Sequence, residues 1–254
     1  MEKFIGKLFI EGEIVLLTGL HIGGSKESGE IGGLDNPVIK TVKGIPYIPG
    51  SSLKGKVRCL LERKYGFQPE RNSGDPCGCG RCDICLLFGA HSADNKTVSR
   101  LIIRDSYLDE DHFIKEVLKG NIEDITYTEE KTENIIDRIK GTAQHPRIME
   151  RVPAGARFRF LSSISFYEND NIESLIKSFI EGLRLLEDEY LGGSGTRGYG
   201  HIRFDNLAFY VKNIESYIKD NRKALIETEA RDLSGIDITK LSQAVVNNLK
   251  VNKK

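Results

Sequence analysis

The sequence predicts an α+β fold in which strands and helices follow the order β-α-β-β-α-β. Two segments, 51–65 and 171–190, carry apolar residues at helical spacing. They alternate with segments rich in β-branched and aromatic residues, at 8–17, 98–107, 156–166 and 199–211. This order is the ferredoxin-like pattern that RNA-recognition modules share, although the same fold hosts many functions and identifies none.

The individual elements are predicted from their side-chain patterns. Segment 8–17 alternates between apolar and polar residues, which is typical of a half-buried strand. The first helix is expected to begin at Ser51 or Ser52, because a serine side chain can cap the free N–H groups of a first turn. The second helix carries an apolar stripe from Ile172 to Tyr190, and the last strand follows it.

Three long insertions interrupt this pattern. Segment 25–49 is rich in glycine and proline, 67–97 is rich in cysteine, and 108–155 is first acidic and then basic. We expect residues 1–212 to form a single domain and residues 213–254 to form a helical C-terminal extension. A chain of 254 residues is long enough for one domain with insertions of this size.

The composition argues against several classes of protein. Hydrophobic residues make up 39% of the chain and charged residues 29%, which predicts a normal core rather than wholesale disorder. No apolar run reaches the length of a membrane span, and the first residues lack the pattern of a signal peptide. We therefore expect a soluble cytoplasmic protein with no membrane partner.

Charge is balanced overall but segregated along the chain. The 37 basic and 37 acidic residues cancel, so net charge alone does not indicate a polyanionic partner. Segments 38–66 and 138–160 are mainly basic, whereas 105–137 between them is mainly acidic. Such segregation permits basic surfaces on a neutral molecule, and a solvated charged face is the simpler alternative for each run.

A glycine-rich segment, 191–204, suggests a binding surface for a polyanion. Its five glycines allow close approach of a ligand backbone, and its N–H groups can turn toward phosphate oxygens. A formal G-x-G-x-x-G motif is present, but it follows a helix and precedes a strand, the reverse of a dinucleotide-binding unit. The alternative is a simple turn into an edge strand. The candidate anion-binding residues are Gly195, Arg197, Tyr199 and His201.

The start of the first helix is a second candidate anion site. Segment 50–56 matches the start of a P-loop, but Val57 replaces the Ser or Thr that would hold Mg²⁺, and no buried strand precedes it. A helix N-terminus with cations nearby still favours a phosphodiester backbone, with a solvated basic face as the alternative. The candidate residues are Ser51, Ser52, Lys54, Lys56 and Arg58.

Four of the five cysteines lie within nine residues, in the spacing C-x-C-x2-C-x2-C. In a chain without a secretory signal this spacing favours a metal site over disulfides, and a closed set of four thiolates predicts a structural zinc ion. A Cys3His set that uses His91, an iron–sulfur cluster and a redox pair are the alternatives. The predicted ligands are Cys77, Cys79, Cys82 and Cys85.

Two further residues have an open interpretation from their local pattern. Asp35 lies in a glycine-flanked loop before Asn36 and Pro37, and an isolated aspartate in that setting is usually a turn former. His21 lies at the expected end of the first strand, where it could bind phosphate or be buried with its ring nitrogens satisfied. Neither a serine-hydrolase order of residues nor a zinc-protease motif is present in the sequence.

Several ordered motifs together resemble one protein family. They are LTGLHIGG at 17–24, GGLDNPVIK at 32–40, IPYIPGSSLKGKVR at 45–58, CLLFG at 85–89, IIRDSYL at 102–108 and GGSGTRGYGHI at 192–202. This combination extends along nearly the whole chain. It is similar to the backbone subunits of type III-A CRISPR Csm effector complexes, which are members of the RAMP superfamily.

The resemblance implies a fold, partners and an activity. It implies a palm of RNA-recognition type with a thumb hairpin at 142–152, in which Arg147 and Arg151 would bind RNA. Several copies of the chain would stack along a CRISPR guide RNA, together with other Csm subunits. The complex would cleave bound single-stranded target RNA at regular intervals, in a reaction that requires a divalent cation, Mg²⁺.

The resemblance also implies roles for single residues. Asp35 matches the loop aspartate of the family and would be catalytic, as a metal ligand, as a positioner for attack by a ribose 2′-hydroxyl, or as a proton-transfer group. His21, Lys54 and Arg58 match guide-contacting positions. Two other functions stay open: a structural subunit that coats RNA without cutting it, and a guide-processing endoribonuclease that uses a base such as His21.

Overall fold

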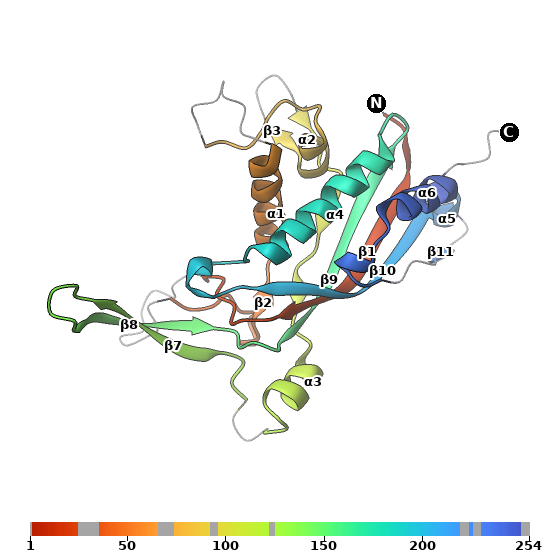
Figure 1. Cartoon of the computed structure of the whole chain (residues 1–254). Coiled ribbons are helices and arrows are strands. Elements are labelled where there is room, and N and C mark those ends of the chain that lie inside the picture. The colour runs from red at the N-terminus through yellow and green to blue at the C-terminus, as the bar shows by residue number, and fades with distance from the viewer. Residues whose placement is uncertain are drawn as a thin grey trace.

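The computed structural model describes residues 2–24, 36–65, 74–91, 96–121, 125–218, 224–225 and 230–249. Its centre is an antiparallel sheet with the strand order β11-β10-β1-β9-β5 (Figure 1). The strands are β1 (Phe4–Leu16), β5 (Leu101–Ile103), β9 (Arg157–Tyr167), β10 (Ile202–Asn213) and β11 (Ala224–Leu225), and β12 (Ala230–Asp232) also pairs with β10. The chain therefore has the expected mixture of helices with an antiparallel sheet.

Two long helices connect the strands and pack against each other. α1 (Gly50–Tyr65) follows β1, and α4 (Ile172–Asp188) connects β9 to β10. A methyl group in place of the Gly182 hydrogen in α4 would come within 2.6 Å of Val57 in α1, so this glycine lets the helices approach closely. α4 also contacts α6 (Ile238–Leu249), and Figure 1 shows α4 lying across the sheet.

The core is built from the alternating side chains of the strands. In β1, five apolar residues are buried: Leu8, Ile10, Ile14, Val15 and Leu16. Their pairing with β10 shifts between Glu11 and Glu13, where Gly12 lies in a bulge. Phe160 of β9 packs edge to face against Phe204 of β10, with ring centroids 5.0 Å apart. The alternation predicted for the first strand is thus confirmed up to the bulge, whereas Ile14, Val15 and Leu16 after it are all buried.

The start of α1 differs from the sequence prediction. The helix begins at Gly50, so Ser51 and Ser52 lie inside its first turn and the predicted serine N-cap is wrong. The N–H group of Gly50 instead donates a hydrogen bond of 2.8 Å to Oδ1 of Asp105, just beyond β5. A carboxylate from a distant segment therefore satisfies a donor at the positive end of the helix.

The insertions form small elements around the sheet. The cysteine-rich segment contains α2 (Asp83–Phe88), β3 (Ala90–His91) and β4 (Lys96–Thr97), and Figure 1 shows it beside one end of α1. β2 (Tyr47–Ile48) pairs with β6 (Ser106–Tyr107), and α3 (Glu110–His112) continues into the short π-helix η1 (Phe113–Val117).

A long hairpin extends from the body of the molecule. β7 (Glu129–Ile136) pairs antiparallel with β8 (Ala143–Arg151), and both strands project away from the sheet in Figure 1. β8 lies within the segment 142–152, where a thumb was expected. The acidic and basic runs of this insertion pair with each other, since Glu133 lies opposite Arg147 and Glu129 lies opposite Arg151. Cross-strand pairs of opposite charge stabilise a hairpin.

The segment after β10, expected to be helical, contains strands as well. Its helices are α5 (Ile214–Ile218), the short 3-10 helix η3 (Leu233–Gly235) and α6, while β11 and β12 extend the sheet beyond β10. Leu241 and Val245 of α6 are fully buried, and this helix contacts α4, β10 and β1. In the described part of the chain, no helix is both long and apolar enough to cross a membrane.

Candidate functional site

His21 lies where three distant segments meet. Its ring is buried, and Nδ1 lies 2.7 Å from the carbonyl oxygen of Glu150 in β8. Because a carbonyl oxygen only accepts hydrogen bonds, Nδ1 carries the proton and Nε2 is the acceptor of the neutral ring. The carbonyl oxygen of His21 in turn accepts a hydrogen bond of 2.9 Å from Gly193. His21 thus joins the segment after β1, the base of the hairpin and the glycine-rich segment.

Glu150 connects the hairpin to the segment that follows Asp35. Its buried carboxylate accepts hydrogen bonds of 2.7 Å from the Val38 N–H and from the Thr128 hydroxyl, and it forms an ion pair with Lys40. Burial acts to raise the pKa of this carboxylate, but the hydrogen bonds from Lys40, Thr128 and Val38 outweigh burial and lower it. The carboxylate therefore stays charged and fastens this segment to β8.

Asp35, the predicted catalytic residue, lies outside the described residues. Its neighbour Asn36 is described, and the side-chain nitrogen of Asn36 lies 3.6 Å from the sulfur of Met149 in β8. Farther along, the N–H of Ile39 donates a hydrogen bond of 2.9 Å to the carbonyl oxygen of Ile22. The chain that follows Asp35 is therefore held at the base of the hairpin, beside His21.

The glycine-rich segment folds tightly onto the chain around His21. It contains the 3-10 turn η2 (Gly195–Arg197). Its N–H groups at Leu191, Gly193, Arg197, Gly198 and Gly200 bond to carbonyl oxygens within the chain. The expectation that these groups turn toward an anion is therefore wrong for these five. Gly195 lies against the ring of Tyr190, and a side chain at position 195 would overlap that ring. Glycine here allows close packing.

Side chains of the glycine-rich segment meet the hairpin around Glu133. Arg197 NH1 lies 3.2 Å from Glu133 Oε2, and Arg147 NH2 lies 3.6 Å from the same oxygen. Tyr199 is buried, and Lys131 Nζ and the Arg151 guanidinium lie 4.5 and 5.1 Å from its ring centroid. We call these six residues the Glu133 cluster: Lys131, Glu133, Arg147, Arg151, Arg197 and Tyr199.

Tyr199 keeps its proton in this cluster. Burial raises the pKa of the phenol, and the Glu133 carboxylate adds to that effect, while Arg151 and Arg197 act against it. The hydroxyl is therefore a hydrogen-bond donor at neutral pH. His201, two residues farther on, is exposed, and its N–H donates a hydrogen bond of 3.0 Å to the Thr18 hydroxyl.

The lysines near the start of α1 face partners within the chain. Lys54 Nζ donates hydrogen bonds to the Ser99 hydroxyl at 2.7 Å and to the Leu101 carbonyl oxygen at 2.9 Å. Burial, and next the Arg58 charge, lower the pKa of Lys54. Lys56 Nζ lies 3.7 Å from the centroid of the Tyr190 ring. Among the other candidates at this helix start, Ser51 is exposed and Ser52 is half-buried.

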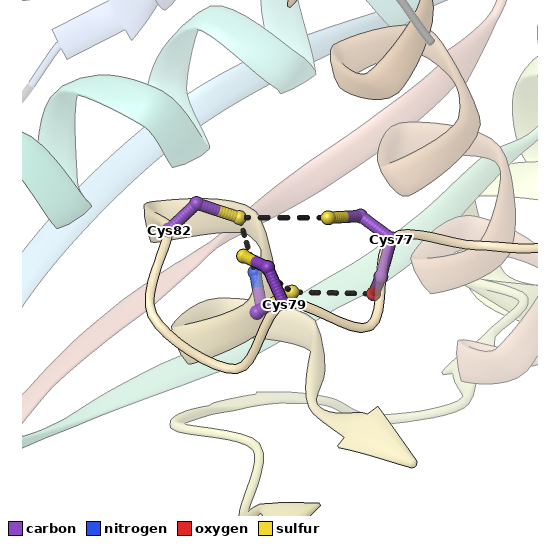
Figure 2. A group of neighbouring side chains, drawn as sticks. Cys77, Cys79 and Cys82 are labelled. Atoms are coloured by element: carbon purple, nitrogen blue, oxygen red, sulfur yellow. Dashed lines mark hydrogen bonds between the residues drawn. The ribbon is translucent and has the colours of Figure 1, made fainter. Parts of the chain in front are cut away.

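The four cysteines converge in a second site beside α1. Figure 2 shows the thiols of Cys77 and Cys82 pointing toward each other, with that of Cys79 close by. Their sulfurs are 4.0 Å apart for Cys77 and Cys82 and 3.8 Å for Cys79 and Cys85, and all four lie within 4.8 Å of one another. Four thiolates about 2.3 Å from one ion would lie about 3.8 Å apart, so the spacing fits a tetrahedral metal. The side chain of His91, the alternative ligand, lies outside the described part.

The thiols of this site differ in how readily they ionise. Burial acts to raise the pKa of Cys79, but hydrogen bonds, first those from the N–H groups of Arg81 and Cys82, lower it to about 6. Burial raises the pKa of Cys85. Because metal ions bind cysteine as thiolate, the lowered pKa of Cys79 favours metal binding at this thiol.

Two residues of α1 hold the backbone of Cys77. The Cys77 N–H donates a hydrogen bond of 2.9 Å to Glu62 Oε1, and the Cys77 carbonyl oxygen accepts one of 2.8 Å from Arg58 NH2. Arg58 Nε also donates to Glu62 Oε1, at 2.9 Å. Arg58, predicted to bind RNA, is thus bonded at two nitrogens to groups within the chain.

Comparison with known proteins assigns the chain to a family. The family model described as "RAMP superfamily" matches residues 13–203. The chain belongs to the RAMP superfamily. A similar protein from Methanocaldococcus jannaschii, named "CRISPR system Cms endoribonuclease Csm3", is 46% identical over 237 residues, 91% of this chain and 92% of that protein. One of the same name from Methanothermobacter thermautotrophicus is 44% identical over 230 residues, 85% of this chain and 90% of that protein.

Two solved structures are similar to this chain. A crystal structure described as "Csm3-Csm4 subcomplex in the type III-A CRISPR-Cas interference complex" contains a chain that is 34% identical, with a TM-score of 0.61 and 97% of each chain covered. The crystal structure of Methanopyrus kandleri Csm3 also has a TM-score of 0.61, covers 98% of this chain and 99% of that chain, and is 21% identical, which supports the fold alone.

Several residues that shape these sites were not predicted from the sequence: Glu62, Lys131, Glu133 and Glu150. The sequence does contain a clue to the hairpin residues. Glutamates at 129–133 and arginines at 147–151 carry opposite charges that lie opposite each other in antiparallel register. Glu150 is the single acidic residue of the basic segment 138–160, an exception that is consistent with a buried, paired carboxylate. Glu62 is likewise the single acidic residue of the basic segment 38–66, but its partner Cys77 lies in a separate insertion, so the sequence does not identify the contact.

Proposed function

We propose that this chain is a guide-RNA-binding backbone subunit of a type III-A CRISPR effector complex that cleaves bound single-stranded target RNA at regular intervals. The observation that carries the proposal is 46% identity to a protein named a Csm3 endoribonuclease, over 91% of this chain. The 34% identical chain of a type III-A Csm3-Csm4 subcomplex supports the same complex type. The partners would be guide RNA, target RNA, other Csm subunits and further copies of this chain, in the cytoplasm.

The strand order supports a ferredoxin-like palm of RNA-recognition type. The predicted first, second, third and fourth strands correspond to β1, β5, β9 and β10. The sheet order β10-β1-β9-β5 is then 4-1-3-2, and the connecting helices α1 and α4 pack against each other. The β7–β8 hairpin would be the thumb.

The arginines of the Glu133 cluster are the best-placed candidates for RNA contact. The side chains of Arg147 and Arg197 are 44% and 55% exposed although both lie near Glu133. Arginine favours phosphate because its guanidinium donates two parallel hydrogen bonds. RNA that follows this surface would pass the base of the hairpin, where His21 and the segment after Asp35 meet.

Asp35 is the proposed catalytic residue. Its support is the family motif together with the two contacts that hold the following residues, Asn36 to Met149 and Val38 to Glu150. Mg²⁺ prefers oxygen ligands, so a carboxylate here suits it. Asp35 would bind that cation, orient the ribose 2′-hydroxyl for in-line attack or transfer a proton.

The cysteine site would hold a different ion with a structural role. Thiolates favour zinc, and four of them leave no open position for a substrate. The spacing of the sulfurs, within 4.8 Å of one another, supports this assignment to Cys77, Cys79, Cys82 and Cys85. Zinc would then fix the loop before α2, in an insertion whose apolar residues Ile84, Leu87 and Phe88 pack into the main core.

The decisive experiment uses Asp35→Ala in a complex reconstituted with guide RNA. We expect target cleavage in Mg²⁺ to be lost while target binding stays within about threefold, because RNA affinity comes mainly from cations near phosphates. Asp111→Ala, which removes an exposed carboxylate of α3, is the matched control and should still cleave. Regularly spaced fragments from the purified Asp35→Ala complex would contradict the assignment.

Two cleavage assays separate the alternative functions. A wild-type complex that binds target RNA in Mg²⁺ without cutting it would favour an RNA-coating subunit. A lone chain that cuts a repeat hairpin without metal would favour guide processing, with His21 Nε2 as the base. The contact of His21 Nδ1 with the Glu150 carbonyl oxygen favours the tautomer in which Nε2 carries no proton.

A further inference from the structure

Glu133 is a shielded carboxylate between two accessible arginines. Its side chain is 11% exposed, whereas those of Arg147 and Arg197 are 44% and 55% exposed. Both arginines approach one oxygen, Oε2, at 3.6 and 3.2 Å, which is longer than the 2.7–2.9 Å of strong charge-assisted bonds. The ion pairs of Glu133 with both arginines are therefore weak, and much of each guanidinium side chain remains exposed to solvent.

The buried hydroxyl of Tyr199 is poorly satisfied. It interacts with the Glu133 carboxylate, which helps to raise the pKa of the phenol, but neither Tyr199 Oη nor Glu133 Oε1 makes a well-formed hydrogen bond within the described part of the chain. Native proteins leave few buried polar atoms in this state. An anion with several oxygens would accept from the Tyr199 hydroxyl with better geometry while it also binds both arginines.

The local charge favours such an anion even with Glu133 present. The cluster has four cations, Lys131, Arg147, Arg151 and Arg197, and its carboxylates are Glu133 and the neighbouring Glu129, which bonds Arg151 at 2.7 Å. Cations therefore outnumber carboxylates among these residues. A phosphodiester, with one charge and two non-bridging oxygens, matches the two arginines and the phenol.

We propose that Glu133 occupies a phosphate-binding site in the RNA-free chain, and that an RNA phosphodiester displaces it from Arg147, Arg197 and Tyr199. The inference rests on the proposed RNA-binding function and adds to it one defined phosphate site and an internal competitor for that site. The competitor lowers the affinity of the free chain for RNA of any sequence, because phosphate contacts carry no sequence information.

The test is the affinity of the full chain for fluorescently labelled single-stranded RNA of two unrelated sequences. Glu133→Gln should bind both about tenfold more tightly, because two partly exposed ion pairs no longer compete with phosphate. The matched control is Glu130→Gln, which removes the same charge from an exposed position on the same strand. Its screened, longer-range effect should not exceed about twofold.

Two further measurements connect the effect to the arginines. The slope of log affinity against log salt should become steeper by about 0.7 for each additional phosphate of the single-stranded RNA that Glu133→Gln neutralises. The tighter binding should largely disappear in the double variant Glu133→Gln with Arg197→Gln, because these residues act on one ligand.

Equal RNA affinities for Glu133→Gln and Glu130→Gln would overturn the proposal, as would weaker binding by Glu133→Gln at unchanged thermal stability. If Glu133→Gln is destabilised, the RNA affinity of Glu133→Asp tests the proposal instead. The shorter aspartate side chain keeps the charge but should release the arginines, so that RNA binds more tightly. Unchanged RNA affinity in Glu133→Asp would overturn the proposal as well. A wild-type chain that binds no RNA would remove the proposed function and this inference together.

Discussion

Glu62 is a buried carboxylate with two donors at one oxygen. Its Oε1 atom accepts hydrogen bonds of 2.9 Å from Arg58 Nε and from the Cys77 N–H. A buried charge is tolerated only when it is paired and hydrogen-bonded, and both conditions hold here. Glu62 and Arg58 therefore position the first cysteine of the proposed zinc site from α1.

The variant Glu62→Gln should bind zinc about tenfold more weakly, because outer residues that orient a ligand contribute affinity of this order. Competition with a chromophoric chelator measures the change. Glu181→Gln, which removes the ion pair of Glu181 with Lys64 of α1, is the control and should keep the wild-type affinity. Unchanged zinc affinity in Glu62→Gln would show that the Cys77 contacts serve only the fold.

Glu187 of α4 is a carboxylate that the fold destabilises in its charged form. Burial raises its pKa, the hydrogen bond from the Phe204 N–H opposes this, and the nearby carboxylates of Asp232, Asp205 and Asp188 raise it further. The folded pKa therefore lies above the unfolded one. Stability from this group is fully present below the ordinary pKa of 4.5 and is lost as the pH rises through the folded pKa.

The variant Glu187→Gln should therefore be more stable than the wild type at pH 7, since it carries no charge to bury. The difference in unfolding free energy should shrink as the pH falls toward 4.5, where the glutamate is itself protonated in the folded chain. Urea unfolding at several pH values measures both effects. Glu168→Gln, at an exposed position, should show no such trend.

At the scale of elements, the glycine-rich segment is shaped by close backbone approaches. Gly200 has a φ of 71°, and a side chain there would overlap the Leu191 carbonyl oxygen. Gly198 has a φ of 86° but open space around the position that a side chain would take. Both positions favour glycine by conformation, and only Gly200 also requires it by packing.

Comparing Gly200→Ala with Gly198→Ala separates these two requirements. Gly198→Ala should cost about 1 kcal/mol of unfolding free energy, the usual cost of left-handed backbone with a side chain. Gly200→Ala should cost about 3 kcal/mol or more, because the overlap adds to the same conformational term. Urea unfolding gives both values, and equal losses would show that the Leu191 contact relaxes easily.

At the scale of the whole molecule, the end of the chain packs back onto its centre. β12 pairs with β10, and α6 contacts α4, β10 and β1. Arg184 of α4 donates a hydrogen bond of 2.9 Å to the Leu233 carbonyl oxygen, which adds a polar connection. These contacts make the last elements part of the main core.

The variant Leu241→Ala should lower the unfolding free energy of the full chain by about 2–5 kcal/mol, because it leaves a cavity at a fully buried position. Lys240→Ala, one residue earlier with an 82% exposed side chain, should change it by less than about 0.5 kcal/mol. A small effect of Leu241→Ala would show that α6 separates readily from the sheet.

Local patterns predicted the central helices and strands but not all of their ends. The segment predicted as a strand over 98–107 contains only β5 and β6, since Arg104 and Asp105 interrupt it. Asp105 instead bonds the Gly50 N–H at the start of α1, 55 residues away in sequence. The local sequence predicted a serine side chain as the acceptor for the N–H groups at the start of α1. In the tertiary structure, the Asp105 carboxylate accepts from the Gly50 N–H instead.

The sequence by itself determined the mixture of helices and antiparallel strands and the close approach of Cys77, Cys79, Cys82 and Cys85. These features follow from apolar periodicity and from short spacings, both of which involve residues that are close in sequence. Only the tertiary structure decided that His21 meets Glu150, 129 residues away, and that Glu133 meets Arg197, 64 residues away. Such contacts depend on the path of the whole chain, and a local pattern of charges identifies a donor without identifying its acceptor.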